Sequence, residues 1–412
     1  MDQSQSRTIR YAVAGFCILA LLMLFGWLIL RKSPPSSEPP LVRVVNVSPR
    51  ARSVDPLFTP ADEAPRETLT SQVAGSETTD TNAATIYRQA FAMYDALSNE
   101  EQNLIVRWRT NVDSSVEAEL CKKIQPICDL LHQAAAVTNC DWGLEQSNTF
   151  AVPAHLSPCR NLARAAIWSV AHCRTGTPSA AVDDLVAASR LGQKVSSSTV
   201  NGHLLDLAIQ GMVIDSVTEH ASTLVGAGDT RLVELLKYAN YDDGLRHAFE
   251  QEADMVTREA DRLAAMPPEE AMRELIQLAD SHSLEFQSMG LAQAIADIRQ
   301  VADVVRQYAQ ALELPEAEYH AWLASLDEAG KTNPLVDRVI SLQMVVIMTQ
   351  AMTVRSAMAA AGLAVMQSGP DALQSHPDPS TGQPFAYTKT ADGFELQSSF
   401  QFQEKPVKLS FR

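Results

Sequence analysis

The most constraining feature of this sequence is an uncharged apolar stretch near its N-terminus. Residues 11–30 read YAVAGFCILALLMLFGWLIL. An α-helix rises about 1.5 Å per residue, so this stretch spans about 30 Å, the thickness of the hydrocarbon core of a bilayer. Four basic residues flank it, and their side chains can extend into the two headgroup layers: Arg7, Arg10, Arg31 and Lys32. We therefore predict one membrane-spanning helix that anchors the rest of the chain.

A cleaved signal peptide is the alternative for the same stretch. The apolar core of a signal peptide is usually about 7–15 residues long and leads into a small-residue cleavage site. The apolar run here is longer, and it continues into Leu-Ile-Leu-Arg-Lys at residues 28–32. We therefore expect the stretch to be retained as a membrane anchor.

The orientation of the anchor is not fixed by the basic residues, because they lie on both sides of it. A head of ten residues before a single span is, however, the usual layout of a bacterial signal anchor. We therefore predict a single-pass protein of the bacterial inner (cytoplasmic) membrane, with residues 1–10 as a cytoplasmic head. The body is then extracytoplasmic, on the periplasmic side.

Residues 31–82 are predicted to form a disordered, proline-rich linker. Eight of the chain's 21 prolines lie there, among many serine, threonine and acidic residues. Such a composition buries too little apolar surface to offset the entropy that is lost on ordering. The exception is the β-prone run LVRVVNV at residues 41–47, which either pairs with an edge strand of a partner or has no structural role.

Residues 83–368 show helical periodicity almost throughout. Asn82 is placed to cap the first helix, and Ser98 with Glu101 forms a capping box for the second. We therefore predict a mainly α-helical chain, with an irregular or solenoid-like domain of antiparallel helices.

Three parts of this domain carry specific expectations. Residues 158–176 and 177–197 have the pattern of a helical hairpin, which resembles the tetratricopeptide type although no second copy follows at a fixed period. The helix predicted at residues 116–137 contains Pro126, which is expected to kink or break it. Residues 339–354 carry no charge but are short and polar for a second span, so we expect a buried central helix.

Residues 369–412 are predicted to form a small β-hairpin or meander packed on the helices. Residues 384–390 and 394–396 fit two strands that are joined by a tight turn at residues 391–393. Residues 407–411 fit a third strand. A third strand is expected because an isolated two-stranded hairpin is only marginally stable in water.

The C-terminal segment also carries a short signature. Residues 378–387 read DPSTGQPFAY and residues 392–396 read DGFEL. Together they resemble a DPxTGxPxxY…DGFxL hairpin of uncharacterised membrane-anchored proteins of planctomycete and verrucomicrobial type, and CDWG at residues 140–143 is similar to the middle of that family. The hairpin is also distantly similar to that of type II secretion pseudopilins, whose run of calcium ligands does not follow here. The resemblance implies an envelope location and a hairpin, and it implies no activity.

Charge and motif content argue against several functions. The net charge of −16 repels phosphate backbones, so nucleic-acid binding is not expected. The sequence contains no GxSxG, HExxH, P-loop or GxGxxG motif, each of which fixes the geometry that its chemistry needs. We therefore predict no catalytic residue and no cofactor.

Besides Cys17 in the predicted span, the chain contains five clustered cysteines: Cys121, Cys128, Cys140, Cys159 and Cys173. In an oxidising compartment some of them would pair and at least one would stay free. Cys140 and Cys159 are one candidate pair, because a disulfide between them would close an irregular loop. Cys121 and Cys128 are a second pair only if their helix is broken, since seven residues of helix separate Cα atoms by about 10.5 Å.

A zinc site is the alternative use of these residues. Cys140, His155 and Cys159 have suitable donor chemistry, and His172 and Cys173 lie nearby in the sequence. Separate buried thiols are a third possibility.

Two further groups of polar side chains lie on predicted helices: His247, Glu250 and Asp254 on one, and His203, Asp206 and His220 on another. The first group shares a helix face, where it suits either acid–base or metal chemistry or simply the solvated face of an amphipathic helix. The second group lies in an otherwise apolar helix, where a core or capping histidine is expected rather than a ligand.

The sequence thus favours a membrane-tethered, non-catalytic envelope protein that binds a protein partner of unknown identity through its helical surface. One alternative is an envelope hydrolase or metal-dependent enzyme, using either the helix of His247 or the cysteine cluster. A second alternative is an accessory component of a secretion system, which rests on the C-terminal resemblance alone.

Overall fold

The computed structural model describes residues 82–412 except 111, 144–152, 175, 197–198, 226–229, 238–240, 280–289 and seven positions between 331 and 340. The predicted head, the predicted anchor and nearly all of the predicted linker lie outside the described residues. The same is true of Cys17 and of the β-prone run at residues 41–47. The described residues cover most of the predicted helical domain and the whole C-terminal segment.

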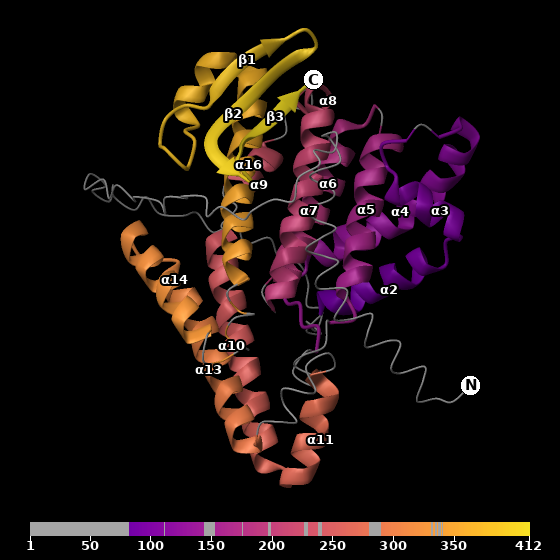
Figure 1. Cartoon of the computed structure of the whole chain (residues 1–412). Helices are drawn as coiled ribbons and strands as arrows, with labels where there is room; N and C mark the ends of the chain where they lie inside the picture. The colour runs from indigo at the N-terminus through magenta and orange to yellow at the C-terminus, as the bar shows by residue number, and fades with distance from the viewer. Residues whose placement is uncertain are drawn as a thin grey trace, which may run out of the picture.

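The described chain is mainly α-helical and ends in a three-stranded antiparallel sheet (Figure 1). The first helices are α2 (Ala83–Asp95), α3 (Asn99–Val106), α4 (Ser114–Ala136), α5 (Leu156–His172), α6 (Pro178–Ser196), α7 (Val200–Glu219), α8 (Ala221–Val225) and α9 (Arg231–Lys237). They are followed by α10 (Tyr241–Ala265), α11 (Pro268–Ala279), α13 (Leu291–Ala311), α14 (Glu316–Gly330), α16 (Leu342–Ser368) and the short 3-10 helix η3 (Pro370–Ser375). The strands are β1 (Ala386–Thr390), β2 (Gly393–Phe402) and β3 (Lys405–Phe411). The predicted class, mainly α with a small C-terminal β segment, is confirmed.

The starts of α2 and α3 follow from their capping residues. The Asn82 side chain accepts a hydrogen bond from the backbone N–H of Ala84 at 3.0 Å. Ser98 and Glu101 form a reciprocal capping box, in which the Glu101 carboxylate accepts from the Ser98 N–H at 2.8 Å. Both predicted caps are confirmed, and they satisfy N–H groups that have no partner inside the helix.

Helix α4 passes through Pro126 without a break, so the break considered for this helix does not occur. Proline removes one backbone hydrogen bond, but α4 buries a continuous face on both sides of it, with Leu120, Ile124 and Leu131 in the core. The free energy gained by packing that face outweighs the tendency of proline to break the helix. The predicted hairpin of two helices is also present, as α5 and α6, which pack against each other around a connection of five residues.

Helix α16 is a central helix that packs against α7, α9, α10, η3 and the sheet (Figure 1). In the described part of the chain it is the one helix whose length and composition could cross a membrane, and 61% of its most apolar window is buried. The expectation of a buried central helix in this region is confirmed. Its small residues allow close contact with the sheet, because a Cβ atom at Gly362 would overlap the ring of Phe411.

The sheet has the order β1-β2-β3, and the predicted third strand is present. Leu396 in β2 faces Tyr387 on one side and Leu409 on the other. Alternate residues of β2 are buried, so one face of the sheet packs on α16 and the other meets solvent. The turn between β1 and β2 needs glycine at position 393, whose φ is +151° and whose Cβ position is occupied by the backbone of Phe411.

Helices α10, α11, α13 and α14 extend from the body, with α11 at the end farthest from the sheet (Figure 1). We call these four helices the helical arm. Two apolar clusters lie in the arm besides the large core of the body: one near the tip is formed by the arm alone, and one near the body is shared with α7 and α16. Phe249 and Tyr308 pack in the cluster near the body, with ring centroids 5.5 Å apart. Leu263, Leu275 and Ile298 pack in the cluster near the tip.

Candidate functional site

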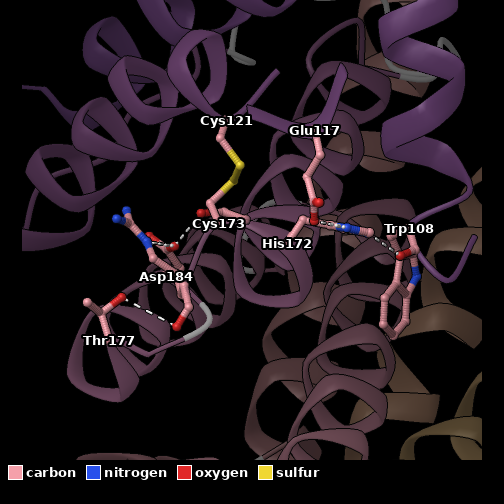
Figure 2. The surroundings of a disulfide bond; sticks show 9 residues. Trp108, Glu117, Cys121, His172, Cys173, Thr177 and Asp184 are labelled. Atoms are coloured by element: carbon pink, nitrogen blue, oxygen red, sulfur yellow. Dashed lines mark hydrogen bonds and ion pairs between the residues drawn. A yellow bond between two sulfur atoms is a disulfide. The ribbon is translucent and has the colours of Figure 1, made fainter. Parts of the chain in front are cut away.

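Three consecutive residues at the end of α5, His172, Cys173 and Arg174, are bonded to three different neighbours (Figure 2). We call these residues and their bonded partners the α5 C-terminal cluster. It connects α5 to α3, α4 and α6.

The covalent part of the cluster is a disulfide between Cys121 of α4 and Cys173, whose Cα atoms are 5.6 Å apart. It joins residues separated by 52 positions. Closing so long a loop restricts the unfolded chain, which is the main way in which a disulfide stabilises a fold.

The ionic part of the cluster is centred on His172. Its Nδ1 lies 2.9 Å from the Glu117 carboxylate, and its Nε2 lies 2.9 Å from the backbone oxygen of Trp108 (Figure 2). The ring therefore bridges α4 and the residue that follows α3 by one step of chain beyond Arg107. Glu117 precedes Cys121 by one helical turn, so the ionic and the covalent bonds use the same face of α4.

The third part of the cluster surrounds Asp184 of α6, whose carboxylate is fully buried. Arg174 donates to it from Nε at 2.9 Å, Ser169 donates from Oγ at 2.8 Å, and His132 Nε2 lies 2.8 Å away. The hydrogen bond to Asp184 raises the pKa of His132. A buried carboxylate is stable when its oxygens are bonded in this way.

Ion pairs continue from this cluster along the end of α3. Arg109 binds Asp215 at 3.1 Å and Glu219 at 2.7 Å, and its guanidinium lies 4.5 Å from the ring centroid of Trp108. Arg355 of α16 binds the other oxygen of Asp215 at 2.7 Å. These pairs connect α3 to α7 and α16 on a half-exposed surface.

His220, which follows α7, has a buried Nε2 atom without a hydrogen-bond partner. Burial lowers its pKa, and the nearby charge of His172 lowers it further. The imidazole of His220 is therefore neutral in the folded protein near neutral pH.

The cysteines differ from the predicted pairing. Cys121 pairs with Cys173, while Cys128, Cys140 and Cys159 are free thiols. Cys121 and Cys128 lie on one unbroken helix, which keeps them too far apart for a disulfide. The predicted pair Cys140–Cys159 is not formed either, and burial raises the pKa of both thiols, which disfavours their reactive thiolate forms.

The residues considered for zinc are not assembled as a metal site. Among the described residues, no three His, Cys, Asp or Glu side chains are grouped as metal ligands. The His155 ring instead stacks on Trp142, with centroids 4.3 Å apart, and burial lowers its pKa to about 4. Cys159 follows one turn later in the core, and Cys140 is partly buried. Packing of Trp142 onto α5 therefore accounts for this segment.

The helix face with His247 and Glu250 lies in solvent. Both side chains are about half exposed, and their nearest N and O atoms are 3.9 Å apart. Asp254 pairs with Arg306 at 3.2 Å. Glu250, Asp254 and Arg306 line an open hollow of about 330 Å³. This arrangement confirms the interpretation of a solvated helix face, since exposed groups of this kind are not desolvated for catalysis.

His203 is a satisfied core histidine, as expected. Its Nε2 lies 2.9 Å from Thr349 Oγ1, and its Nδ1 lies 3.0 Å from Ser196 Oγ. Thr349 donates its proton to the oxygen of Val345, so it accepts from His203 Nε2–H, and Nδ1 accepts from Ser196. Ser196 also bonds Asp206, whose pKa burial raises to about 7 although the hydrogen bonds from Gln210 and Ser196 lower it.

The sequence did not single out the partners in the α5 C-terminal cluster. His172 and Cys173 were recognised as neighbours of a possible zinc site, but Glu117, Arg174 and Asp184 were not. The run His-Cys-Arg at the end of a predicted helix did indicate that several polar side chains there could bond to neighbouring elements. The partners lie 10 to 64 residues away in sequence, so the pairing required the tertiary fold.

Comparisons with known proteins identify no relative of this chain. No family model, no curated protein and no solved structure matches it. The resemblance of residues 378–396 to an envelope-protein hairpin therefore stays a prediction that rests on those residues alone.

Proposed function

We propose that the chain is a membrane-tethered, non-catalytic envelope protein that binds a protein partner through the surface of its helical arm. The observation that carries this proposal is the arm itself, which extends beyond the body (Figure 1) and packs its apolar residues into one cluster at its tip and a second cluster that it shares with α7 and α16. An extended helical surface of this kind suits recognition of another chain.

The outer surface of the arm is rich in charged side chains. Arg299 binds Asp261 at 2.8 Å across α10 and α13, and Arg306 binds Asp254 at 3.2 Å. Acidic residues outnumber basic ones in the described sequence of the arm. A complementary partner surface is therefore basic, since opposite potentials guide association and fix its register.

Two features support an extracytoplasmic body behind an N-terminal anchor. Residues 11–30 have the length and apolarity of a membrane span. The Cys121–Cys173 disulfide suits an oxidising compartment such as the periplasm. The solenoid-like arrangement and the inner-membrane location remain part of this proposal.

Site-specific cross-linking in intact cells tests the proposed surface. A photoreactive residue at position 261 or 299, on the outer surface of the arm, is expected to capture one partner in stoichiometric yield. The same residue at the exposed position 371 of η3 is the matched control and is expected to capture none. Equal capture at all three positions, or capture at position 371 alone, would show that the arm is not the binding surface.

The orientation is tested separately. An alkaline phosphatase fused after residue 82 is active only where its own disulfides form, so it is expected to be active in cells. An inactive but intact fusion would place the body in the cytoplasm. That outcome would remove the envelope location without deciding whether the arm binds a partner.

A further inference from the structure

Strand β1 leaves one edge of the C-terminal sheet open. It pairs with β2 on one side, and in the described part of the chain no strand lies on its other side. All five residues of β1 are exposed. The opposite edge of the sheet differs, because β3 contacts α7 and α16. An open edge presents backbone N–H and C=O groups that can pair with a further strand.

The register of the hairpin identifies the backbone groups that point outward. Thr390 and Gly393 are partners across a two-residue turn, where the flanking residues of a hairpin exchange both hydrogen bonds. Inward and outward groups alternate along a strand, so the backbone groups of Tyr387 and Lys389 point away from β2. The ring of Tyr387 stacks on Phe394, with centroids 5.4 Å apart, and 36% of Tyr387 is exposed. The edge therefore combines outward backbone groups with a partly uncovered aromatic ring.

We propose that residues 41–47 of the same chain, LVRVVNV, add to this edge as a fourth strand of the sheet. Four of these seven residues are valine, which favours a β-strand. The run is long enough to pair with all five residues of β1. It lies outside the residues that the structure describes, and its composition distinguishes it from the rest of the proline-rich linker.

The chain is long enough to make this contact. The 34 residues at positions 48–81 separate the run from Asn82, where the described chain begins. A polypeptide of that length spans about 30 Å on average as a coil and about 110 Å when it is extended. Attachment within one chain gives an effective concentration on the order of a millimolar, which favours this occupant over an equally suited strand of another molecule.

Side-chain alternation determines which face of the run meets the helices. Val42 and Val44 share one face, and Arg43 lies on the other. We expect the valine face to cover the ring of Tyr387, and Arg43 to meet solvent. A second copy of β1 suits the edge less well, because each copy would bring its own Lys389 to it.

The pairing also places the sheet near the membrane and the helical arm away from it. Eight residues, 33–40, lie between the basic flank of the predicted anchor and the run, and four of them are prolines. A proline-rich spacer of this length extends about 25 Å. Because α11 lies at the end of the molecule farthest from the sheet, the arm then projects away from the bilayer (Figure 1). This orientation rests on the proposed anchor, whereas the pairing of residues 41–47 with β1 does not.

Hydrogen exchange of the full-length protein in detergent, resolved to single amides, tests the pairing. Val44→Pro/Val45→Pro removes the donor that faces β1, whichever of the two N–H groups points inward. In this variant the amides of Tyr387 and Lys389 are expected to exchange at least about ten times faster than in the unsubstituted protein. The reason is that a strand paired for about nine-tenths of the time slows exchange about tenfold. The amide of Thr388 points to β2, so it is the internal reference and should not change.

Val73→Pro/Ala74→Pro, in the same linker but outside the run, is the matched control and should leave exchange unchanged. The pairing is wrong if the amides of Tyr387 and Lys389 exchange equally fast in the unsubstituted protein and in the run variant, or if the control accelerates them as much. Faster exchange after tenfold dilution of the unsubstituted protein would show that a second copy occupies the edge, which also overturns the pairing within one chain. These outcomes do not depend on whether the arm binds a partner, so failure of the pairing is distinguishable from failure of the proposed function.

Discussion

Replacing Asp206 with asparagine is expected to stabilise the protein at alkaline pH and to have a smaller effect in acid. Asp206 is fully buried beside Gln210, which donates to its Oδ1 at 2.7 Å. Ser196 bonds the same carboxyl, and burial favours the protonated form of Asp206 more strongly than these two hydrogen bonds favour the carboxylate. Asparagine reproduces that protonated group, because its amide N–H can donate to Ser196 and its oxygen can accept from Gln210.

The magnitude follows from the pKa of Asp206. Burial raises this pKa from its ordinary 3.8 to about 7. The folded state therefore holds a proton that the unfolded state has lost, and the free energy of unfolding falls by about 1.4 kcal/mol per pH unit between these values. The contribution is present in full below pH 3.8 and is lost as the pH rises through about 7. The total is about 4 kcal/mol.

Thermal unfolding of the full-length protein and of Asp206→Asn at about pH 5 and about pH 8 measures this effect. About 3 kcal/mol of the difference falls between these two values. For a folded part of roughly 330 residues this corresponds to a gain of about 4 °C in the relative Tm of the variant at the higher pH. Asp129→Asn, at an exposed carboxylate on α4, is the matched control and should show no such gain. An equal Tm difference for Asp206→Asn at both pH values would refute a neutral Asp206.

Three further substitutions test the packing of the body by chemical unfolding. Cys121→Ser removes the disulfide to Cys173 and should lower the free energy of unfolding by about 4 kcal/mol, given the length of the closed loop; reductant should then have no further effect on the variant. Gly362→Ala places a methyl group against the ring of Phe411 and should cost about 1–3 kcal/mol, whereas no loss would mean that the sheet is loosely docked. Asp184→Asn removes the buried carboxylate that binds Arg174 and His132, and it should lower the free energy of unfolding by about 3–5 kcal/mol. A decrease below about 1 kcal/mol would contradict the stabilising role of this carboxylate.

The sequence predicted the features that depend on neighbouring residues. The caps at Asn82 and Ser98, the α5–α6 hairpin and the three strands all follow from local side-chain chemistry or from periodicity. The central position of α16 followed from its uncharged run of residues. Pro126 was the local exception, because the apolar face of α4 continues on both sides of it and tertiary packing outweighs the missing hydrogen bond.

The candidate site was less predictable, because its bonds join distant positions. Five clustered cysteines allow many pairings, and only the fold brings the end of α5 beside the middle of α4. Asp184 had no distinguishing signal, since it lies next to an exposed acidic residue, Asp183, on the same helix. Helical periodicity indicates which face is buried, but it does not identify the charge that a buried carboxylate will meet.

Three acid–base groups in the body, Asp184, Asp206 and His220, illustrate one physical principle with different outcomes. Asp184 meets Arg174 and His132 and so remains paired in the core. Asp206 meets only neutral donors and acceptors, so burial favours its protonated form. His220 has no hydrogen-bond partner for its buried Nε2, so burial favours its neutral form. Titration of Asp206, whose pKa burial raises to about 7, therefore changes the charge inside the body near neutral pH. The pH response of the body should therefore arise at Asp206 of α7 and at His132, whose pKa the hydrogen bond to Asp184 raises, rather than at the disulfide itself.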